Sequence, residues 1–119
     1  LREVTLGKNG LFKTAKKGSI YVDNTTASAN IARELYKEAK VKGFDFLDAP
    51  ISGGQAGAEG GILTVMVGGD EAPYKKAEPV IDCYSKKIKS QSFAASIGVS
   101  AAFPLYSLIH FSAFALVRL

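Results

Sequence analysis

Two short segments of the sequence carry small polar residues that could bind a ligand. The first is Asn24-Thr25-Thr26, and the second is Ser52-Gly53-Gly54. Neither segment has a bulky side chain, so hydroxyls and backbone N–H groups can face an anion or a ribose. We therefore expect both segments to be ligand-binding loops.

Other kinds of site have little support in the sequence. Cys83 and His110 have no partner ligands or nucleophilic constellation nearby. Asp48 is expected to end a strand and not to act as an acid or base. We assign no catalytic residue and no metal ligand to this chain.

The elements around the first loop form a strand, a helix and a second strand. Ser19–Asp23 and Phe44–Leu47 are short apolar runs typical of strands. Between them, residues 28–42 have the periodicity of an amphipathic helix, with Gly43 at the expected left-handed cap. The apolar positions of this helix are Ile31, Leu35 and Ala39. The two strands of such a βαβ unit must be parallel.

Two further elements are expected after the second loop. Ile62–Val67 is typical of a buried strand, and Asp70 is in position to cap a helix that runs to about Ile81, with Pro73 in its first turn. The alternation indicates an α/β fold. Because ligands of such sheets bind at the carboxyl ends of parallel strands, both loops should meet at that edge.

The segment from Asp48 to Gly69 resembles the substrate-binding signature of the β-hydroxyacid dehydrogenases. That family includes 3-hydroxyisobutyrate dehydrogenase, tartronate semialdehyde reductase and, more distantly, 6-phosphogluconate dehydrogenase. Its signature reads Asp-Ala-Pro-Val-Ser-Gly-Gly, two residues, Gly-Ala, two residues, Gly-Thr-Leu, and an apolar strand ending in Gly-Gly. This chain departs from it mildly, with Ile51 for Val and Ile62 for Thr. Asp23-Asn24-Thr25-Thr26 also resembles the family's Asp-x-Ser-Thr element.

The resemblance implies roles for both loops. Thr26, with Thr25 beside it, would lie against NAD or NADP near the nicotinamide. Ser52, Gly53 and Gly54 would hold the carboxylate and hydroxyl of a small β-hydroxy acid substrate. The implied reaction is the NAD(P)-dependent interconversion of a 3-hydroxyisobutyrate-like acid and its semialdehyde or keto form.

Each loop also has a purely structural interpretation. Thr25 and Thr26 could cap the helix that follows, and the glycines after Ser52 could form a tight connection without a ligand. The joint occurrence of both motifs in the family's order and spacing favours the functional interpretation.

Two parts of the family's machinery have no counterpart in this sequence. It contains no Gly-x-Gly-x-x-Gly loop, whose glycines let a pyrophosphate approach a helix N-terminus. The family also needs a general acid/base Lys on a later helix, and no lysine follows Lys89. We expect the isolated chain to be inactive and to bind NAD weakly or not at all.

At 119 residues the chain has the length of one small domain. The resemblance implies the second half of a Rossmann-type, 6-phosphogluconate dehydrogenase-like nucleotide-binding domain in residues 1–82, followed by a divergent apolar tail in residues 83–119. We interpret the tail as the product of a frameshift or truncation near residue 90. Residues 90–119 should then lie outside the cooperative core.

The tail also suggests an alternative function. Phe93 to Val117 is 25 residues without a formal charge, which is long enough to span a hydrocarbon layer of about 30 Å. Serines, Gly98 and Pro104 dilute this stretch, so we expect no membrane association. The alternative is a non-catalytic α/β module that is tethered to a membrane or that oligomerises through the tail, and a homo-oligomer remains open.

The charge distribution argues against nucleic acid as a partner. Residues 1–82 carry eleven basic and eleven acidic residues, so the net charge of +4 comes from residues 83–119. A nucleic-acid surface needs a clustered basic face, which residues 1–82 do not provide. The lone Cys83 and the absence of a signal peptide predict a cytoplasmic protein, with the mitochondrial matrix as the eukaryotic alternative.

Overall fold

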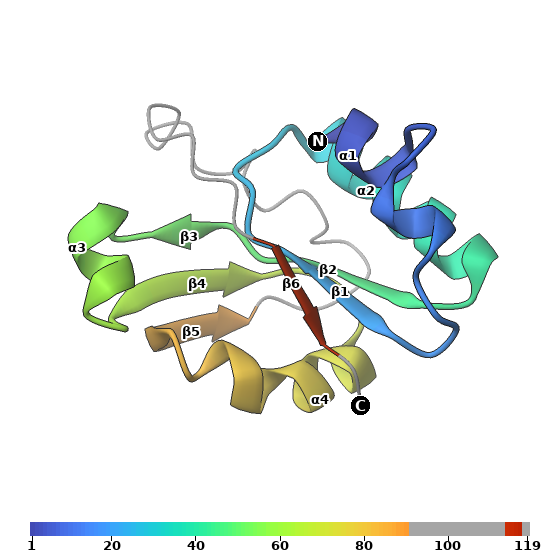
Figure 1. The fold of residues 1–119 in the computed structure, drawn as a ribbon. Coiled ribbons are helices and arrows are strands. Elements are labelled where there is room, and N and C mark those ends of the chain that lie inside the picture. The colour runs from blue at the N-terminus through green and yellow to red at the C-terminus, as the bar shows by residue number, and fades with distance from the viewer. Residues whose placement is uncertain (91–113, 118–119) are drawn as a thin grey trace.

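The computed structural model describes residues 1–90 and 114–117 of the chain. Its strands form a sheet that lies between two layers of helices (Figure 1). One face is covered by α1 (Arg2–Leu6), the short 3-10 helix η1 (Leu11–Lys13) and α2 (Ala29–Lys42). The other face is covered by α4 (Glu71–Ile81). The expected α/β fold is confirmed.

The βαβ unit forms as the sequence predicts. Strand β1 (Ile20–Asp23) pairs in parallel with β2 (Asp45–Asp48), and α2 connects them. At the start of α2, Ser28 Oγ accepts a hydrogen bond of 3.4 Å from the Ile31 N–H. At its end, Gly43 adopts φ 84°, a left-handed conformation that suits glycine.

A continuous ladder joins the two halves of the sheet. Strand β3 (Ile51–Ser52) pairs antiparallel with β4 (Leu63–Val67), and the pairs Asp48 with Gly68, Ile51 with Val65 and Ser52 with Thr64 keep one register. The Met66 N–H donates to the Pro50 carbonyl at 3.0 Å. Strands β2 and β3 therefore form one bent strand. Strand β1 pairs with its first part, and β4 pairs with its second part.

Strand β5 (Ser85–Ser90) pairs in parallel with β4, with an irregularity between Leu63 and Thr64. The sequence did not predict this strand, because it contains three lysines and one large apolar residue. Such a composition is typical of edge strands, where lysines oppose further pairing. The strand lies just past the expected boundary at residue 82, and that boundary stays a prediction.

Helix α4 begins where expected but is capped differently. Asp70 stands at the N-cap position, yet its side chain makes no capping hydrogen bond. Its carboxylate instead accepts a hydrogen bond from the Tyr36 hydroxyl at 2.9 Å and pairs with Lys40 at 2.6 Å. Both partners lie on α2, more than 25 residues away, so a local sequence pattern could not predict this arrangement.

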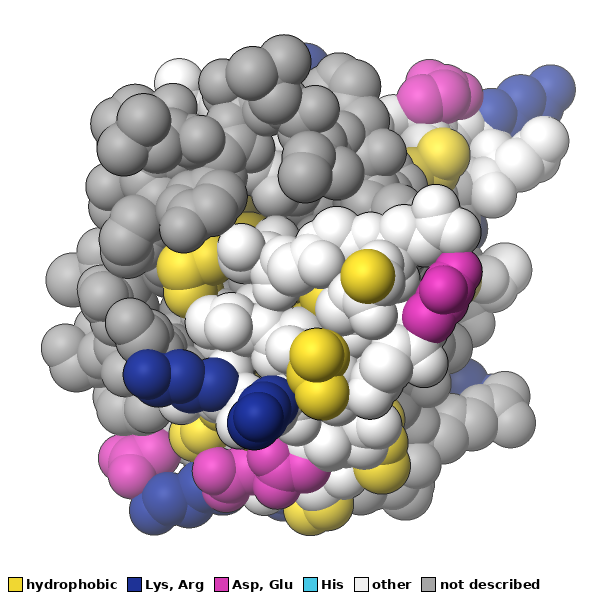
Figure 2. Space-filling model, turned by 90° about the vertical axis from the view of Figure 1, so that its left-hand side faces the viewer, with side chains coloured by type: hydrophobic (Ala, Val, Ile, Leu, Met, Phe, Trp, Pro, Cys, Tyr) yellow, Lys and Arg dark blue, Asp and Glu magenta, His cyan; other side chains and the backbone are white. Residues whose placement is uncertain are grey.

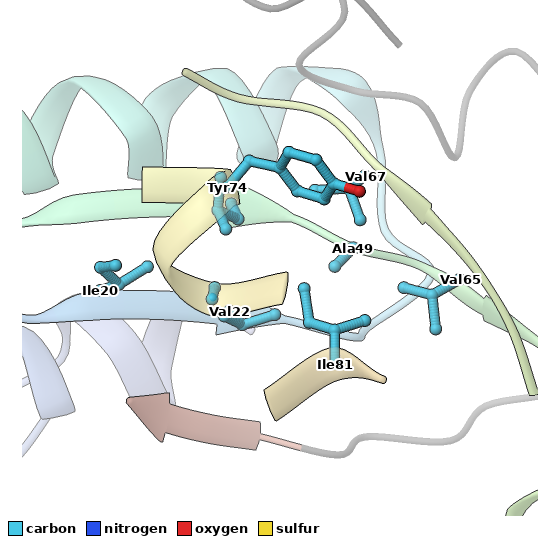
Figure 3. Packing of buried hydrophobic residues seen from close by; sticks show 9 residues of the cluster. Ile20, Val22, Ala49, Val65, Val67, Tyr74 and Ile81 are labelled. Carbon is cyan, nitrogen blue, oxygen red and sulfur yellow. The ribbon is translucent and has the colours of Figure 1, made fainter. Parts of the chain in front are cut away.

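The hydrophobic core has two clusters, one on each face of the sheet. On the α4 face, Tyr74, Ala77 and Ile81 pack on the strand residues. Figure 3 shows Tyr74 and Ile81 over Ile20, Val22, Ala49, Val65 and Val67. On the α2 face, Phe12, Tyr21, Leu35, Ala39, Phe44 and Phe46 form the second cluster. Because both faces are covered, β1 is buried along its whole length.

Beyond β5, four more residues of the tail belong to the sheet. Strand β6 (Phe114–Val117) pairs antiparallel with the outer edge of β1. This pairing places β6 on the sheet, and the expectation that residues 90–119 lie outside the cooperative core stays a prediction. The rest of the tail, residues 91–113 and 118–119, lies outside the described residues. Among the described residues, no helix is both long and apolar enough to cross a membrane.

Candidate functional site

Hydrogen bonds tie together the two segments that leave β1 and β2. The Ala49 N–H donates to the Asp23 carbonyl at 2.7 Å, and the Asn24 side-chain amide donates to the Ala49 carbonyl at 2.6 Å. The Tyr84 hydroxyl, which follows α4, reaches Asn24 Oδ1 at 3.4 Å. The carboxyl ends of the two strands therefore lie at one edge, and buried Asn24 fixes their spacing.

Sequence reasoning did not single out the linking role of Asn24. This residue occupies the variable position of the Asp-x-Ser-Thr element, so the motif itself carries no signal for it. An amide is suited to this place because it both donates and accepts. Its only sequence signal is a polar residue directly after a buried strand.

The first candidate loop makes a tight turn after β1. The Thr25 N–H donates to the Asp23 carboxylate at 2.9 Å. The Thr25 hydroxyl is buried and has no well-aligned hydrogen-bond partner among the described residues, and Thr26 is partly exposed. Neither threonine caps α2, because Ser28 holds the N-cap position. The capping interpretation of Thr25 and Thr26 is therefore wrong.

The Asp23 carboxyl lies in an unusual environment at this edge. It is buried beside Asp48, its register partner on β2. Burial raises the pKa of Asp23, and the hydrogen bonds from Thr25 oppose that shift only in part. The carboxylate holds the turn that presents Thr25 and Thr26, so it has a structural task in this loop.

The second candidate loop begins at the end of β3. Ser52 is the last residue of that strand, and Gly53 and Gly54 open the short helix α3 (Gly54–Glu59). Gly53 has φ 138°, and a Cβ there would lie 3.0 Å from Leu63 Cδ2. Gly54 has φ 61°, and a Cβ there would meet nothing within 4 Å. The backbone at Gly53 thus requires glycine for the fold, whereas Gly54 borders open space.

The two loops share one edge, but Ser52 lies farther along it. Asp48 pairs with Asp23 at the end of β1, and Ser52 is four residues beyond Asp48. The distance from Asp48 to Ser52 is therefore at most about 13 Å along an extended strand. Figure 2 shows the side of the molecule on which α3 lies, and its surface there is largely backbone and uncharged polar atoms. Such a surface suits contact between a polar ligand and backbone groups.

The described residues contain no group of three or more His, Cys, Asp or Glu side chains that could hold a metal ion. Cys83 is exposed, and its thiol lies 3.2 Å from the Pro79 carbonyl. His110 lies outside the described residues.

Comparison with protein families identifies one match. Residues 1–93 match the family described as the NAD binding domain of 6-phosphogluconate dehydrogenase. An uncharacterized oxidoreductase of Shewanella frigidimarina is 52% identical over 86 residues, covering 72% of this chain and 30% of that protein. The mitochondrial 3-hydroxyisobutyrate dehydrogenase of Mus musculus is 41% identical over 86 residues, covering 72% of this chain and 26% of the enzyme.

Solved structures give the same result. The chain superimposes on the Mycobacterium tuberculosis 3-hydroxyisobutyrate dehydrogenase, solved with L-serine, with a TM-score of 0.70 and 38% identity. The similarity covers 76% of this chain and 31% of that chain. The chain thus spans less than a third of the length of each of these proteins.

Proposed function

Because the chain belongs to the family of the NAD binding domain of 6-phosphogluconate dehydrogenase, we propose that it supplies the nicotinamide-facing and substrate-facing loops of an NAD- or NADP-dependent oxidoreductase. The substrate class is a small β-hydroxy acid, and the product is its semialdehyde or keto form. The match confirms the family that the Asp48–Gly69 segment predicts.

The turn at Ser52-Gly53-Gly54 carries the proposal. Its glycines open the backbone at the edge where β1 and β2 end, and Gly54 borders open space. A carboxylate or hydroxyl of the substrate can accept hydrogen bonds from backbone N–H groups there, with the Ser52 hydroxyl beside them. L-serine, named in the M. tuberculosis structure, is itself a small acid with a hydroxyl on its β-carbon.

Thr25 and Thr26 are the proposed cofactor contacts. The buried Thr25 hydroxyl lacks a well-aligned partner among the described residues, and the turn held by Asp23 presents both threonines at the same edge. A nicotinamide cofactor would supply hydride transfer when bound. The sequence has neither the pyrophosphate loop nor the acid/base lysine of the family, so the residues of this chain orient the ligands and do not transfer the proton.

A chimera tests the substrate role. Residues 1–90 would replace the matching segment of the mouse 3-hydroxyisobutyrate dehydrogenase, and oxidation of 3-hydroxyisobutyrate would be measured. Ser52→Ala and Gly54→Ala should each raise KM for the acid by about tenfold. The first removes a hydrogen-bonding hydroxyl, and the second places a methyl group where the substrate approaches the backbone.

Gly18→Ala is the matched control for Gly54→Ala. Gly18 also has a left-handed φ, 81°, and a Cβ there would meet nothing within 4 Å. It lies in the turn before β1, at the opposite end of that strand from the candidate loops. Unchanged KM values in folded Ser52→Ala and Gly54→Ala chimeras would remove the substrate role.

A further inference from the structure

Tyr84 is connected to both candidate loops through neighbouring residues. It directly precedes β5, which lies beside β4 (Figure 1), and it packs half-buried against the core cluster on the α4 face. Its hydroxyl donates to Asn24 Oδ1 at 3.4 Å. Its backbone carbonyl accepts from the Leu63 N–H at 3.3 Å. The side chain and the backbone of one residue therefore contact the supports of two different loops.

On the cofactor side, the connection runs through Asn24. This residue directly precedes Thr25 and Thr26, and its amide donates to the Ala49 carbonyl at 2.6 Å. The amide oxygen and the amide N–H belong to one planar group, so the Tyr84 hydroxyl orients the same group that binds Ala49. The turn with the two threonines is therefore held relative to Tyr84 as well as to the end of β2.

On the substrate side, the connection runs through Leu63, the first residue of β4. Its side chain lies against the second loop, since a Cβ at Gly53 would be 3.0 Å from Leu63 Cδ2. Ser52 pairs with Thr64, the next residue of β4. The backbone bond between Leu63 and Tyr84 therefore holds the strand against which the Ser52 turn packs.

We propose that Tyr84 is a positioning residue whose hydroxyl, acting through Asn24, sets the spacing between the threonine turn and the Ser52 turn. The inference rests on the proposed function, in which these turns contact the cofactor and the substrate. Transfer between two bound ligands depends steeply on how closely their reacting atoms approach, and a misplacement of about 1 Å can cost a factor of about 100 in rate. Loss of the hydroxyl should therefore slow turnover more than it weakens the binding of either ligand.

NMR spectroscopy of the full chain tests the positioning without any assay of activity. In Tyr84→Phe the ring keeps its packing and only the hydroxyl is lost. Residual dipolar couplings report the orientation of each N–H bond relative to the sheet. In this variant the couplings of Thr25 and Thr26 should no longer fit the orientation that they have in the wild type relative to Gly53 and Gly54.

Tyr74→Phe is the matched control for Tyr84→Phe. Tyr74 packs in the same core cluster, and its hydroxyl donates to Glu78 at 2.9 Å within α4. Its replacement removes the same atom from a hydrogen bond that does not involve Asn24. The couplings in both turns should therefore equal those of the wild type.

The chimera described above tests the effect on turnover. Tyr84→Phe should lower kcat about fivefold and change KM for the acid and for the cofactor by less than about twofold. The deuterium isotope effect on kcat should rise, measured with acid deuterated at the carbon that bears the hydroxyl. A smaller amount of folded enzyme would lower kcat without changing this ratio. In an Asn24→Ala background, Tyr84→Phe should lower kcat no further, because both changes act through the Asn24 amide.

Wild-type couplings in Tyr84→Phe would overturn the inference. Equal values of kcat and of the isotope effect in the Tyr84→Phe and Tyr74→Phe chimeras would also overturn it. Ser52→Ala and Gly54→Ala test the proposed function separately, through KM for the acid. A raised KM in those two chimeras, with unchanged turnover in Tyr84→Phe, would keep the substrate role and remove the role of Tyr84.

Discussion

Lys40 Nζ on α2 lies 2.6 Å from Asp70 Oδ2 at the start of α4, so one ion pair joins helices that cover opposite faces of the sheet. The same ammonium group lies 2.5 Å from Asp45, the first residue of β2. Burial lowers the pKa of Lys40, but its hydrogen bonds to Asp45 and Asp70 outweigh that effect and raise it. Burial raises the pKa of Asp70, and the bonds from Lys40 and Tyr36 outweigh it and lower the pKa overall.

Asp70→Asn should reduce the free energy of unfolding by about 0.5–1 kcal/mol at pH 7, a modest loss because the pair is partly exposed. Because the pKa of Asp70 is lowered in the folded chain, its ionised carboxylate stabilises the fold when the pH is above the usual pKa of 3.8. This stabilisation is lost as the pH falls below that value. The difference between variant and wild type should therefore shrink below about pH 4. Urea unfolding at several pH values measures it. Glu71→Gln, beside Asp70 in an exposed pair with Lys75, should change stability by less than half as much.

Gly53→Ala should destabilise the fold by about 2–3 kcal/mol, because φ 138° is strained for any residue with a Cβ and Leu63 lies 3.0 Å from that position. Gly18→Ala, with its left-handed φ of 81° and open surroundings, should cost only about 1 kcal/mol. Urea denaturation of the two variants gives the comparison. Equal losses would show that the turn before α3 adapts to a side chain.

Asn24→Ala should destabilise the chain by about 2 kcal/mol, because it removes a buried hydrogen bond and leaves the Ala49 carbonyl without its amide partner. Tyr84→Phe should cost less, since its bond to Asn24 is long, at 3.4 Å. In the double variant the two losses should not add, because both act through the Asn24 amide. Additive losses would contradict the linkage.

The isolated chain should show no hydride transfer between 3-hydroxyisobutyrate and NAD or NADP. The sequence has no Gly-x-Gly-x-x-Gly loop and no lysine after Lys89, so it lacks the family's pyrophosphate contact and proton donor. The absorbance of the reduced cofactor provides the assay, and the mouse enzyme chimera is the positive control. Activity that survives repurification would refute this prediction.

The local elements were the most predictable part of the fold. The four-residue repeat of Ile31, Leu35 and Ala39 and the stop at Gly43 identify α2, and the structure has it at residues 29–42. The sequence did not predict β5 because its three lysines are not typical of a strand, and the strand forms by pairing with β4. The capping of α4 differs because Lys40 and Tyr36 draw the Asp70 carboxylate away, a contact between distant segments.

The sequence predicted the two loops of the candidate site better than it predicted the hydrogen bonds between them. The sequence identified both loops and the edge where their strands end, and the structure ties those ends together through Asn24 and Ala49. The assignments of Thr25, Thr26, Ser52, Gly53 and Gly54 to a cofactor or substrate stay predictions. The strain at Gly53 could not be read from the sequence, because it depends on how Leu63 packs across the ladder.

The unbroken register from Asp48 to Ser52 makes the length of this segment a constraint on sequence change. Loss or gain of one residue between these positions would turn every later side chain to the opposite face of the sheet. Ile51, which packs against the core, would then point away from α4, and the Ser52 turn would present itself on the wrong side. Replacement of one apolar residue by another, such as Ile for Val at position 51, leaves the count intact. Evolution of this segment should therefore tolerate substitutions and reject insertions and deletions.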